Sequence, residues 1–352
     1  MTDIPAFLKR MLSAPGLSGH EAPIRALIEE TWQPLVHELN VSRMGSLHGL
    51  RCGSGPTPRP SILVAAHMDA IGLMVNGNMD GFLRVTSIGG LDPRVLPHQP
   101  VTVHGRRDLP GVLVSPPERL LPANVTEGAV PIEYLLVDTG LTPEEVRRLV
   151  RVGDLVSYAQ PPFETAGDTL VGHSLDNRAS VAALTVCLDE LQKRPHTWDL
   201  WAVASTQEEV SLGGSTTSAF SLRPSLAVAV DVTFASSPGC PSHKTFPLGK
   251  GPTITWGPNI HPALFDAFRD LAERHEIPFN VEVTPRHSGT DAYAMQVVAE
   301  GIPCIVIGIP LRYMHTPVEM VALKDITRAG RLLAEFIAAL DEKFMDTMVW
   351  KD

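Results

Sequence analysis

Residues 61–69 read SILVAAHMD, and this stretch decides the fold class of the chain. From Ile62 to Ala66 every residue is apolar, without the alternation expected of a half-buried strand. Such a run predicts a parallel-type strand over residues 61–66 that is covered on both faces. The run stops at His67, so His67 and Asp69 are expected at the carboxyl end of a buried strand.

Three later apolar runs extend this pattern: LWAVAST at 200–206, LAVAVDV at 226–232 and CIVIGI at 304–309. Helical stretches alternate with them: one follows GHSLDNRAS (172–180) and runs to about 193, one lies near 262–275, and one runs from about 324 to 343. This alternation predicts an α/β fold with a mixed, largely parallel sheet flanked by helices.

The first forty residues predict two amphipathic helices, the second preceded by SGHE at 18–21. The spacing of Ser18 and Glu21 is that of a capping box. We therefore expect Ser18 to accept a hydrogen bond from a first-turn amide while Glu21 reaches back.

The texture of the sequence changes between about Gly72 and Pro162. Short alternating segments such as FLRVTSI and VTVHG are separated there by Gly, Pro and Asn-Gly punctuation, which predicts a small β-rich module. The strand–helix alternation resumes after it. We therefore expect one discontinuous domain, residues 1–70 and 165–352, and an inserted β-rich domain at 71–164.

Composition narrows the classes of partner. The chain has 352 residues, of which 44% are hydrophobic, so it can bury a large core. Its length alone predicts about two domains. The net charge is −10 and the 29 Lys and Arg form no basic run, which excludes a general binder of nucleic acid or anionic membranes. Small molecules and peptides remain. The chain starts without a signal-type apolar core and has no apolar run near the ~18 residues of a membrane helix, so a cytoplasmic location is expected.

The four cysteines are Cys52, Cys187, Cys240 and Cys304, far apart and without a CxxC pair. This spacing favours neither a disulfide framework nor a thiolate metal site. We expect four free thiols.

Polar residues stand where the predicted strands end, and ligands collect at the carboxyl ends of strands in open α/β sheets. His67 and Asp69 follow the first strand, Glu208 and Glu209 follow LWAVAST, Asp231 ends LAVAV, and His315 lies beyond CIVIGIP; Asp176 starts a helix. Imidazoles and carboxylates without thiolates suit one or two divalent ions, such as Zn²⁺, Co²⁺ or Mn²⁺. The set predicts a metal site of hydrolytic type.

Each residue alone also fits a turn, a cap or a helix start, and the carboxylates of Glu208 and Glu209 would favour a helix dipole. Adjacent residues at a strand end point in different directions, however. One carboxylate can hold a metal while the other takes a proton from a water molecule that the metal activates. Asp69 is placed to orient the imidazole of His67. Gly213 and Gly214 fit a tight turn beside the site, or a merely structural one.

Six motifs together resemble the M42 family of metallo-aminopeptidases, which contains the tetrahedral (TET) and glutamyl aminopeptidases. They are AAHMDAIGLMV, GHSLDNRAS, STQEEVSLGGS, AVDVT, SGTDA and GIPCIVIGIPLRYMHTPVEMV, in that order over nearly the whole chain. The resemblance implies a zinc-peptidase-type fold and two metal ions. His67 and Asp231 would ligate one ion, Glu209 and His315 the other, Asp176 would bridge them, and Glu208 would be the general base.

The resemblance also implies that the inserted β-rich segment is a lid domain, which in relatives helps dimers assemble into a dodecameric, tetrahedral shell. Two positions depart from the family pattern: His173 stands where lysine is common, and Asn177 where a second acidic residue is frequent. We expect a structural role for His173. Six further histidines outside the motifs are expected at the surface: His98, His104, His243, His261, His275 and His287.

The predicted function is that of a cytoplasmic two-metal aminopeptidase that hydrolyses N-terminal residues from peptides and forms homo-oligomers. A deacylase or carboxypeptidase on the same fold remains an alternative, and the M42 group has also attracted cellulase labels. With only 6% aromatic residues, nothing resembles a sugar-binding platform. A non-catalytic scaffold with a peptidase fold is a further alternative, although such a protein would be expected to lose its ligands first.

Overall fold

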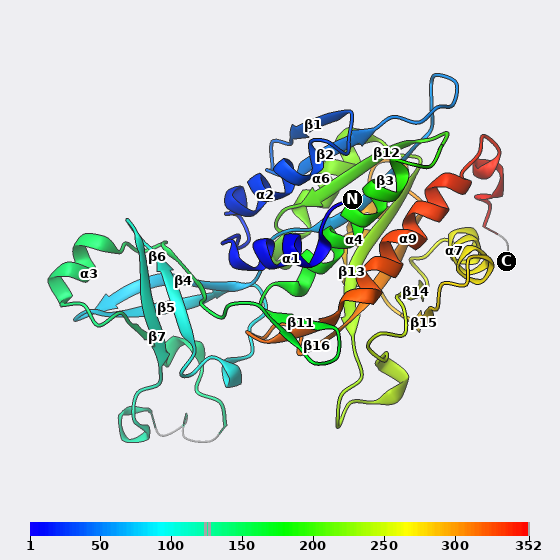
Figure 1. Cartoon of the computed structure of the whole chain (residues 1–352). Coiled ribbons are helices and arrows are strands. Elements are labelled where there is room, and N and C mark those ends of the chain that lie inside the picture. The colour runs from blue at the N-terminus through cyan, green and yellow to red at the C-terminus, as the bar shows by residue number, and fades with distance from the viewer. Residues whose placement is uncertain (123–124, 126–127, 351–352) are drawn as a thin grey trace.

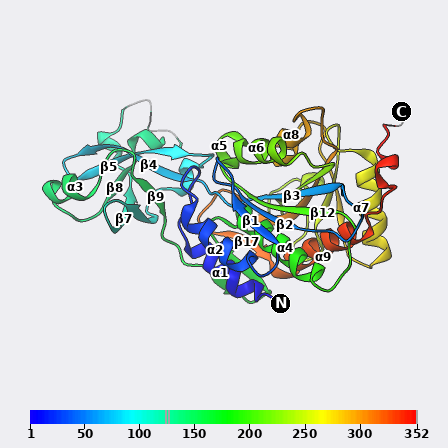
Figure 2. The same cartoon turned by 90° about the horizontal axis from the view of Figure 1, so that it is seen from above.

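The computed structural model describes residues 1–122, 125 and 128–350. A large sheet with helices on both faces forms one part of the molecule, and a small β-barrel projects from it (Figures 1 and 2). Among the helices of the described residues, none is both long and apolar enough to span a membrane.

Four parallel strands form the centre of the sheet, in the order β12 (Asp199–Ser205), β3 (Ser61–His67), β13 (Leu226–Phe234) and β16 (Cys304–Arg312). Antiparallel strands extend it on both sides: β2 (Leu47–Arg51) and β1 (Glu38–Val41) beyond β12, and β17 (Glu319–Ala322), β11 (Thr169–Gly172) and β10 (Phe163–Thr165) beyond β16. The short strand β14 (Thr253–Trp256) pairs with β16, and β15 (Asn280–Val283) pairs with β14. The predicted mixed sheet flanked by helices is confirmed, and its parallel part is the four-stranded centre. β3 is the buried strand that its apolar run predicts.

Helices cover both faces of this sheet, as Figure 2 shows from above. One group comprises α1 (Ile4–Ser13), α2 (Ala22–Trp32), α4 (Leu175–Leu191) and α9 (Leu323–Ala339), and the other α5 (Glu208–Ser211), α6 (Gly213–Leu222) and α8 (Asp291–Gln296); α7 (Pro262–Arg274) packs beside β14. α4 is buried on nearly every side because it lies between the sheet and α9. Gly330 permits that packing, since a Cβ there would lie 2.4 Å from the carbonyl oxygen of Ala183.

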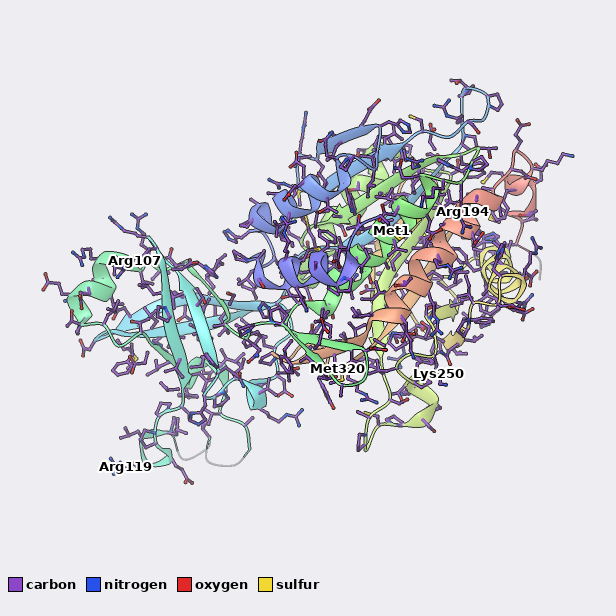
Figure 3. The ribbon with its side chains drawn as sticks, viewed as in Figure 1. Met1, Arg107, Arg119, Arg194, Lys250 and Met320 are labelled. Carbon is purple, nitrogen blue, oxygen red and sulfur yellow. The ribbon has the colours of Figure 1, made fainter. Side chains whose placement is uncertain are left out.

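The inserted segment forms a closed barrel with its own apolar core, which includes Leu73, Val101 and Val137. Its strands, in barrel order, are β4 (Gly72–Met79), β5 (Phe82–Ile88), β8 (Leu136–Asp138), β7 (Asp108–Val114), β6 (Pro100–His104) and β9 (Leu155–Tyr158), with helix α3 (Pro143–Leu149). Residues 123–124 and 126–127 of the segment lie outside the described residues, as do 351–352 of the larger domain. In Figure 3 the side chains of Arg107 and Arg119 mark two ends of the barrel, away from Arg194 on the sheet domain.

Three sequence expectations are wrong in detail. The capping box is absent, because α2 starts at Ala22 without any side-chain cap and the carboxylate of Glu21 bonds elsewhere. Asp231 does not end its strand, since β13 continues to Phe234. His261 is buried rather than at the surface, because its ring accepts from the amide of Ala263 at the start of α7. The four cysteines are free, as expected.

Candidate metal centre

The carboxyl ends of the central strands open into a cavity of about 660 Å³. Six residues predicted from the sequence line this cavity: His67, Asp176, Glu208, Glu209, Asp231 and His315. They come from β3, β13, the first turns of α4 and α5, and the turn between β16 and β17, which are far apart in the sequence. The parallel sheet brings them together because neighbouring strands end at the same edge: His67 is paired in register with Ser205, just before the glutamate pair.

Asp176 lies at the middle of the cluster, in the first turn of α4. Its Oδ1 is 3.2 Å from Nε2 of His67, and its Oδ2 is 3.3 Å from Nε2 of His315. The two oxygens of one carboxylate therefore face two different imidazoles. Asp231 and Glu209 complete two groups: Asp231 Oδ1 is 3.8 Å from His67 Nε2, and Glu209 Oε2 is 3.6 Å from His315 Nε2.

Asp69 is fully buried beneath the cluster and is not part of the cavity wall. Its Oδ1 accepts from the backbone amide of Glu208 at 3.0 Å, and its Oδ2 accepts from the amide of Glu209 at 3.3 Å. Nδ1 of His67 is 3.5 Å from the carboxylate and 3.2 Å from the backbone oxygen of Asp69. Asp69 thus contacts the imidazole as predicted, and it also holds the backbone of the glutamate pair.

The glutamate pair begins the single turn of α5. A residue in the left-handed conformation flanks this turn on each side: Gln207 at φ 56° and Leu212 at φ 56°. Gly213 and Gly214 therefore do not make the sharp turn, contrary to one reading of the sequence. Gly214 is needed for close packing instead, because a Cβ there would lie 2.3 Å from the carbonyl oxygen of Thr206.

The barrel reaches the cluster through the loop after β5. The backbone of Gly90 packs against the ring of His315, because a Cβ at Gly90 would lie 3.2 Å from Nδ1 of that ring. The inserted segment therefore shapes the site although none of the six cavity-lining site residues belongs to it.

The donor set fits divalent cations. Oxygen and nitrogen ligands lie about 2.0–2.2 Å from zinc, so a tetrahedral site separates two ligand atoms by about 3.3–3.6 Å. The four imidazole–carboxylate distances, 3.2, 3.3, 3.6 and 3.8 Å, are close to that spacing. Two triads have ligand atoms within 4.8 Å of one another: His67, Asp176 and Glu209, and His67, Glu208 and Asp231. Oε1 of Glu209 is buried without a hydrogen-bond partner among the described residues.

The electrostatics of the cluster point the same way. Burial, together with the neighbouring Asp291 and Glu209, raises the pKa of Glu208 to about 8. Burial and Asp176 raise the pKa of Glu209 to about 9, and burial raises the pKa of Asp231 well above its usual value. So many buried carboxylates repel one another, and divalent cations between them would offset that repulsion.

Two buried carboxylates near the site were quoted in the sequence motifs without a role. Glu319 accepts from the amide of Asp176 at 3.1 Å and from the amide of His315 at 2.9 Å, so it ties two site residues together. Asp291 accepts from the hydroxyl of Ser205 at 2.6 Å and lies near Glu208. For Glu319 a signal existed, since it follows His315 by four residues in RYMHTPVE.

The two departures from the family pattern have structural surroundings. His173 is largely buried, which lowers its pKa to about 3, and its Nδ1 lies 2.8 Å from the hydroxyl of Ser174. Asn177 donates to the carbonyl oxygen of Val230 at 2.9 Å, which ties α4 to β13. Neither residue lines the cavity, whereas His287, predicted only as a surface histidine, does.

Known proteins share this architecture. The family model described as M42 glutamyl aminopeptidase matches residues 49–332. The lysyl aminopeptidase of Pyrococcus furiosus is 34% identical over 341 residues, which cover 95% of this chain and 96% of that protein. A TET aminopeptidase from a marine-sediment archaeon of the Thaumarchaeota superposes with a TM-score of 0.91 at 28% identity, covering 98% of this chain and 99% of its own.

The TET1 peptidase of Pyrococcus horikoshii, described as assembling into a tetrahedron or a large octahedral shell, gives a TM-score of 0.83 at 28% identity. The match covers 96% of this chain and 100% of that chain. The similarity thus extends over the sheet domain and the barrel together.

Proposed function

The chain belongs to the M42 glutamyl aminopeptidase family, and we propose that it is a two-metal aminopeptidase that hydrolyses N-terminal residues from peptides. The observation that carries this proposal is the position of Asp176, whose oxygens lie 3.2 Å and 3.3 Å from the imidazoles of His67 and His315. A carboxylate that faces two ligand groups in this way is suited to bridge two cations.

In this proposal His67 and Asp231 hold one ion, and Glu209 and His315 hold the other. The nitrogen and oxygen donors suit Zn²⁺ or Co²⁺, with Mn²⁺ also compatible. When bound, the ions polarise the scissile carbonyl and lower the pKa of a water molecule.

Glu208 is the general base. Its carboxylate lines the cavity, and its Oε2 lies 3.7 Å from Nε2 of His67, beside the ligands rather than behind them. From this position it takes a proton from the attacking water and passes it to the leaving amine. Asp69 fixes the backbone that carries Glu208, through the 3.0 Å hydrogen bond to its amide.

Among the acidic side chains of the cavity wall, Glu282 is neither a proposed ligand nor the proposed base, and its carboxylate favours the cationic free amine at the start of a peptide. This supports an aminopeptidase over a deacylase, whose substrates have blocked amines. The test compares three kinds of substrate on chelated and on metal-restored protein: chromogenic aminoacyl substrates, their N-acetylated counterparts and soluble cellulose. It distinguishes an aminopeptidase from a deacylase, a cellulase and a non-catalytic scaffold. We expect metal-dependent activity on the free amines alone. Equal rates on blocked substrates, cellulose hydrolysis, or full activity after complete metal removal would refute the proposal.

We also propose that the chain forms homo-oligomers, with the barrel segment 71–164 as the assembly and access module. Its support is the barrel's separate core, its projection from the sheet domain (Figure 1) and the shells described for the Pyrococcus horikoshii peptidase. Size-exclusion chromatography with light scattering should show a large oligomer. A monomer at micromolar concentration would contradict the proposed assembly, but it would not contradict the proposed aminopeptidase activity.

A further inference from the structure

The loop before α2 is bound to the site rather than to its own helix. The amide of Ser18 donates to the carbonyl oxygen of Ala70 at 3.1 Å, and its hydroxyl donates to the carboxylate of Asp69. Leu17 forms an isolated parallel bridge with Ala70. The loop therefore lies against the chain just after His67.

Glu21 is the last residue of this loop, and its side chain is only 5% exposed. Its Oε1 accepts from the amide of Gly19 at 2.7 Å and from the amide of Gln207 at 3.2 Å. The second bond crosses from the N-terminal loop to the residue just before the glutamate pair. Burying a carboxylate costs free energy unless its oxygens accept hydrogen bonds. The amides of Gly19 and Gln207 supply such bonds to Glu21.

Gln207 needs such support, because it adopts the left-handed conformation with φ 56° and ψ 31°. That conformation is strained for a residue with a Cβ. The backbone amides of residues 207, 208 and 209 all donate hydrogen bonds to buried carboxylates. Glu21 accepts from the first amide, and Asp69 accepts from the other two. Two acidic side chains thus fix the backbone of the whole turn.

We propose that Glu21 is a positioning residue, which holds the left-handed turn at Gln207 and thereby directs the carboxylates of Glu208 and Glu209 into the cavity. Its effect on catalysis rests on the proposed function, whereas its effect on the turn does not. A misplacement of a catalytic group by about 1 Å can cost about 10²-fold in rate. Removing the support is therefore expected to lower kcat.

The test compares Glu21→Ala, which removes the acceptor, with Glu21→Gln, which keeps one acceptor oxygen, and with Glu21→Asp, which shortens the reach. Asp325→Ala is the matched control. Asp325 is also a buried carboxylate that accepts from two backbone amides, those of Gly249 and Gly251, but it does not line the cavity. Each variant is assayed for melting temperature, bound metal, amide hydrogen exchange over 206–212, and kcat and KM.

For Glu21→Ala we expect faster exchange at residues 207–209 and a fall in kcat of about 10–100-fold, with KM within about threefold. Glu21→Asp should fall between Ala and wild type, and Glu21→Gln should recover most of the rate. Asp325→Ala should lower the melting temperature while leaving kcat and the exchange of 207–209 unchanged.

Unchanged exchange at residues 207–209 in both Glu21→Ala and Glu21→Asp would overturn the inference. An equal loss of kcat in Asp325→Ala would also overturn it, because general destabilisation would then explain the effect. If the wild-type protein shows no peptidase activity, the proposed function fails, while the exchange data still decide whether Glu21 holds the turn.

Discussion

Glu208 and Glu209 are neighbours in the sequence, but their carboxylates face different partners. Oε2 of Glu208 lies 3.7 Å from His67, and Oε2 of Glu209 lies 3.6 Å from His315. The two histidines face opposite oxygens of Asp176, at 3.2 Å and 3.3 Å. One turn of backbone therefore supplies a carboxylate to each half of the cluster, which is the physical basis for giving the two glutamates different roles.

Substitution by glutamine separates these roles. Glu208→Gln keeps the size of the side chain but removes the base, so the rate should fall on the order of 10²–10⁴-fold with metal content unchanged. Glu209→Gln weakens a ligand, so metal content should fall and excess metal should restore part of the activity. Elemental analysis with initial rates checks both. Wild-type metal content and near-normal rates in both variants would refute the assignment.

His48 makes a separate prediction about acid stability, remote from the cluster. It is buried against Trp201, its Nε2 lies 2.8 Å from the hydroxyl of Ser218, and burial lowers its pKa to about 4. The unfolded chain, with a pKa near 6.5, binds the proton first. The free energy of unfolding therefore falls as the pH drops from about 6.5 to 4, by about 2 kcal/mol between pH 7 and 5.

Urea denaturation at pH 7 and pH 5 tests this. His48→Gln should lose stability at pH 7 but show a smaller decline towards pH 5 than wild type. His243→Gln, at an exposed position, should decline as wild type does. An identical decline for wild type and His48→Gln would show that His48 does not contribute to acid sensitivity.

At the residue scale, the sequence predicted the side chains that converge on the cavity but, apart from Asp69, not those that support them. His67, Asp231 and the glutamates stand next to apolar runs, so the strand-end rule finds them. Glu21 was misassigned because its spacing from Ser18 also matches a capping box. Its actual partner, Gln207, is 186 residues away, and no local pattern encodes a contact of that range.

At the scale of elements, α5 and α6 form a tight corner that follows β12. Gly213 and Gly214 begin α6, but their surroundings differ. A Cβ at Gly214 would lie 2.3 Å from the backbone oxygen of Thr206, whereas at Gly213 the nearest atom is the flexible hydroxyl of Ser211 at 3.0 Å. The corner therefore depends on only one of the two glycines.

This asymmetry predicts unlike effects of the same substitution. Gly214→Ala should force Thr206 away and displace the turn that carries Glu208, which lowers both the melting temperature and kcat. Gly213→Ala should be neutral or stabilising by up to about 1 kcal/mol, because alanine favours the helix. Thermal unfolding and steady-state kinetics on the two variants check this. Equal effects of both substitutions would contradict the packing argument.

The elements themselves were largely predictable, because their apolar runs are long and unambiguous. β3 and α7 lie within one residue of the predicted ranges. The end of β13 could not be predicted, because the polar Asp231 interrupts its apolar run while the backbone continues in the sheet to Phe234. Pairing of the antiparallel edge strands could not be predicted either, because it depends on register across distant segments.

At the scale of the whole molecule, the cavity is lined by residues of the sheet domain, and the loop after β5 packs against one of them, His315, through Gly90. Within the part of the chain that the structure describes, its lining contains five acidic residues, Asp176, Glu208, Glu209, Asp231 and Glu282, and neither lysine nor arginine. Glu282 stands apart from the proposed ligands and accepts from the hydroxyls of Thr233 and Thr253, each at 2.8 Å. A carboxylate on the substrate would thus meet no lysine or arginine in the described part of the lining. It would instead lie near the carboxylate of Glu282.

We therefore expect N-terminal glutamyl and aspartyl residues to be poor substrates, at least ~10-fold slower in kcat/KM than lysyl or leucyl residues, because like charges repel in a partly buried site. A panel of aminoacyl substrates measures the ratios. Glu282→Gln should raise the glutamyl rate relative to the leucyl rate. A wild-type preference for glutamyl substrates would contradict this account of the cavity.

The central claim is that one cavity holds two cations bridged by Asp176. The most direct measurement is a titration of the chelated protein with Co²⁺ or Zn²⁺, followed by elemental analysis and by the rate on a free aminoacyl substrate. The account predicts two ions per subunit in the wild-type protein, activity that returns as they bind, and a loss of bound metal in Asp176→Asn. Binding of one ion or none, or full activity without metal, would contradict it.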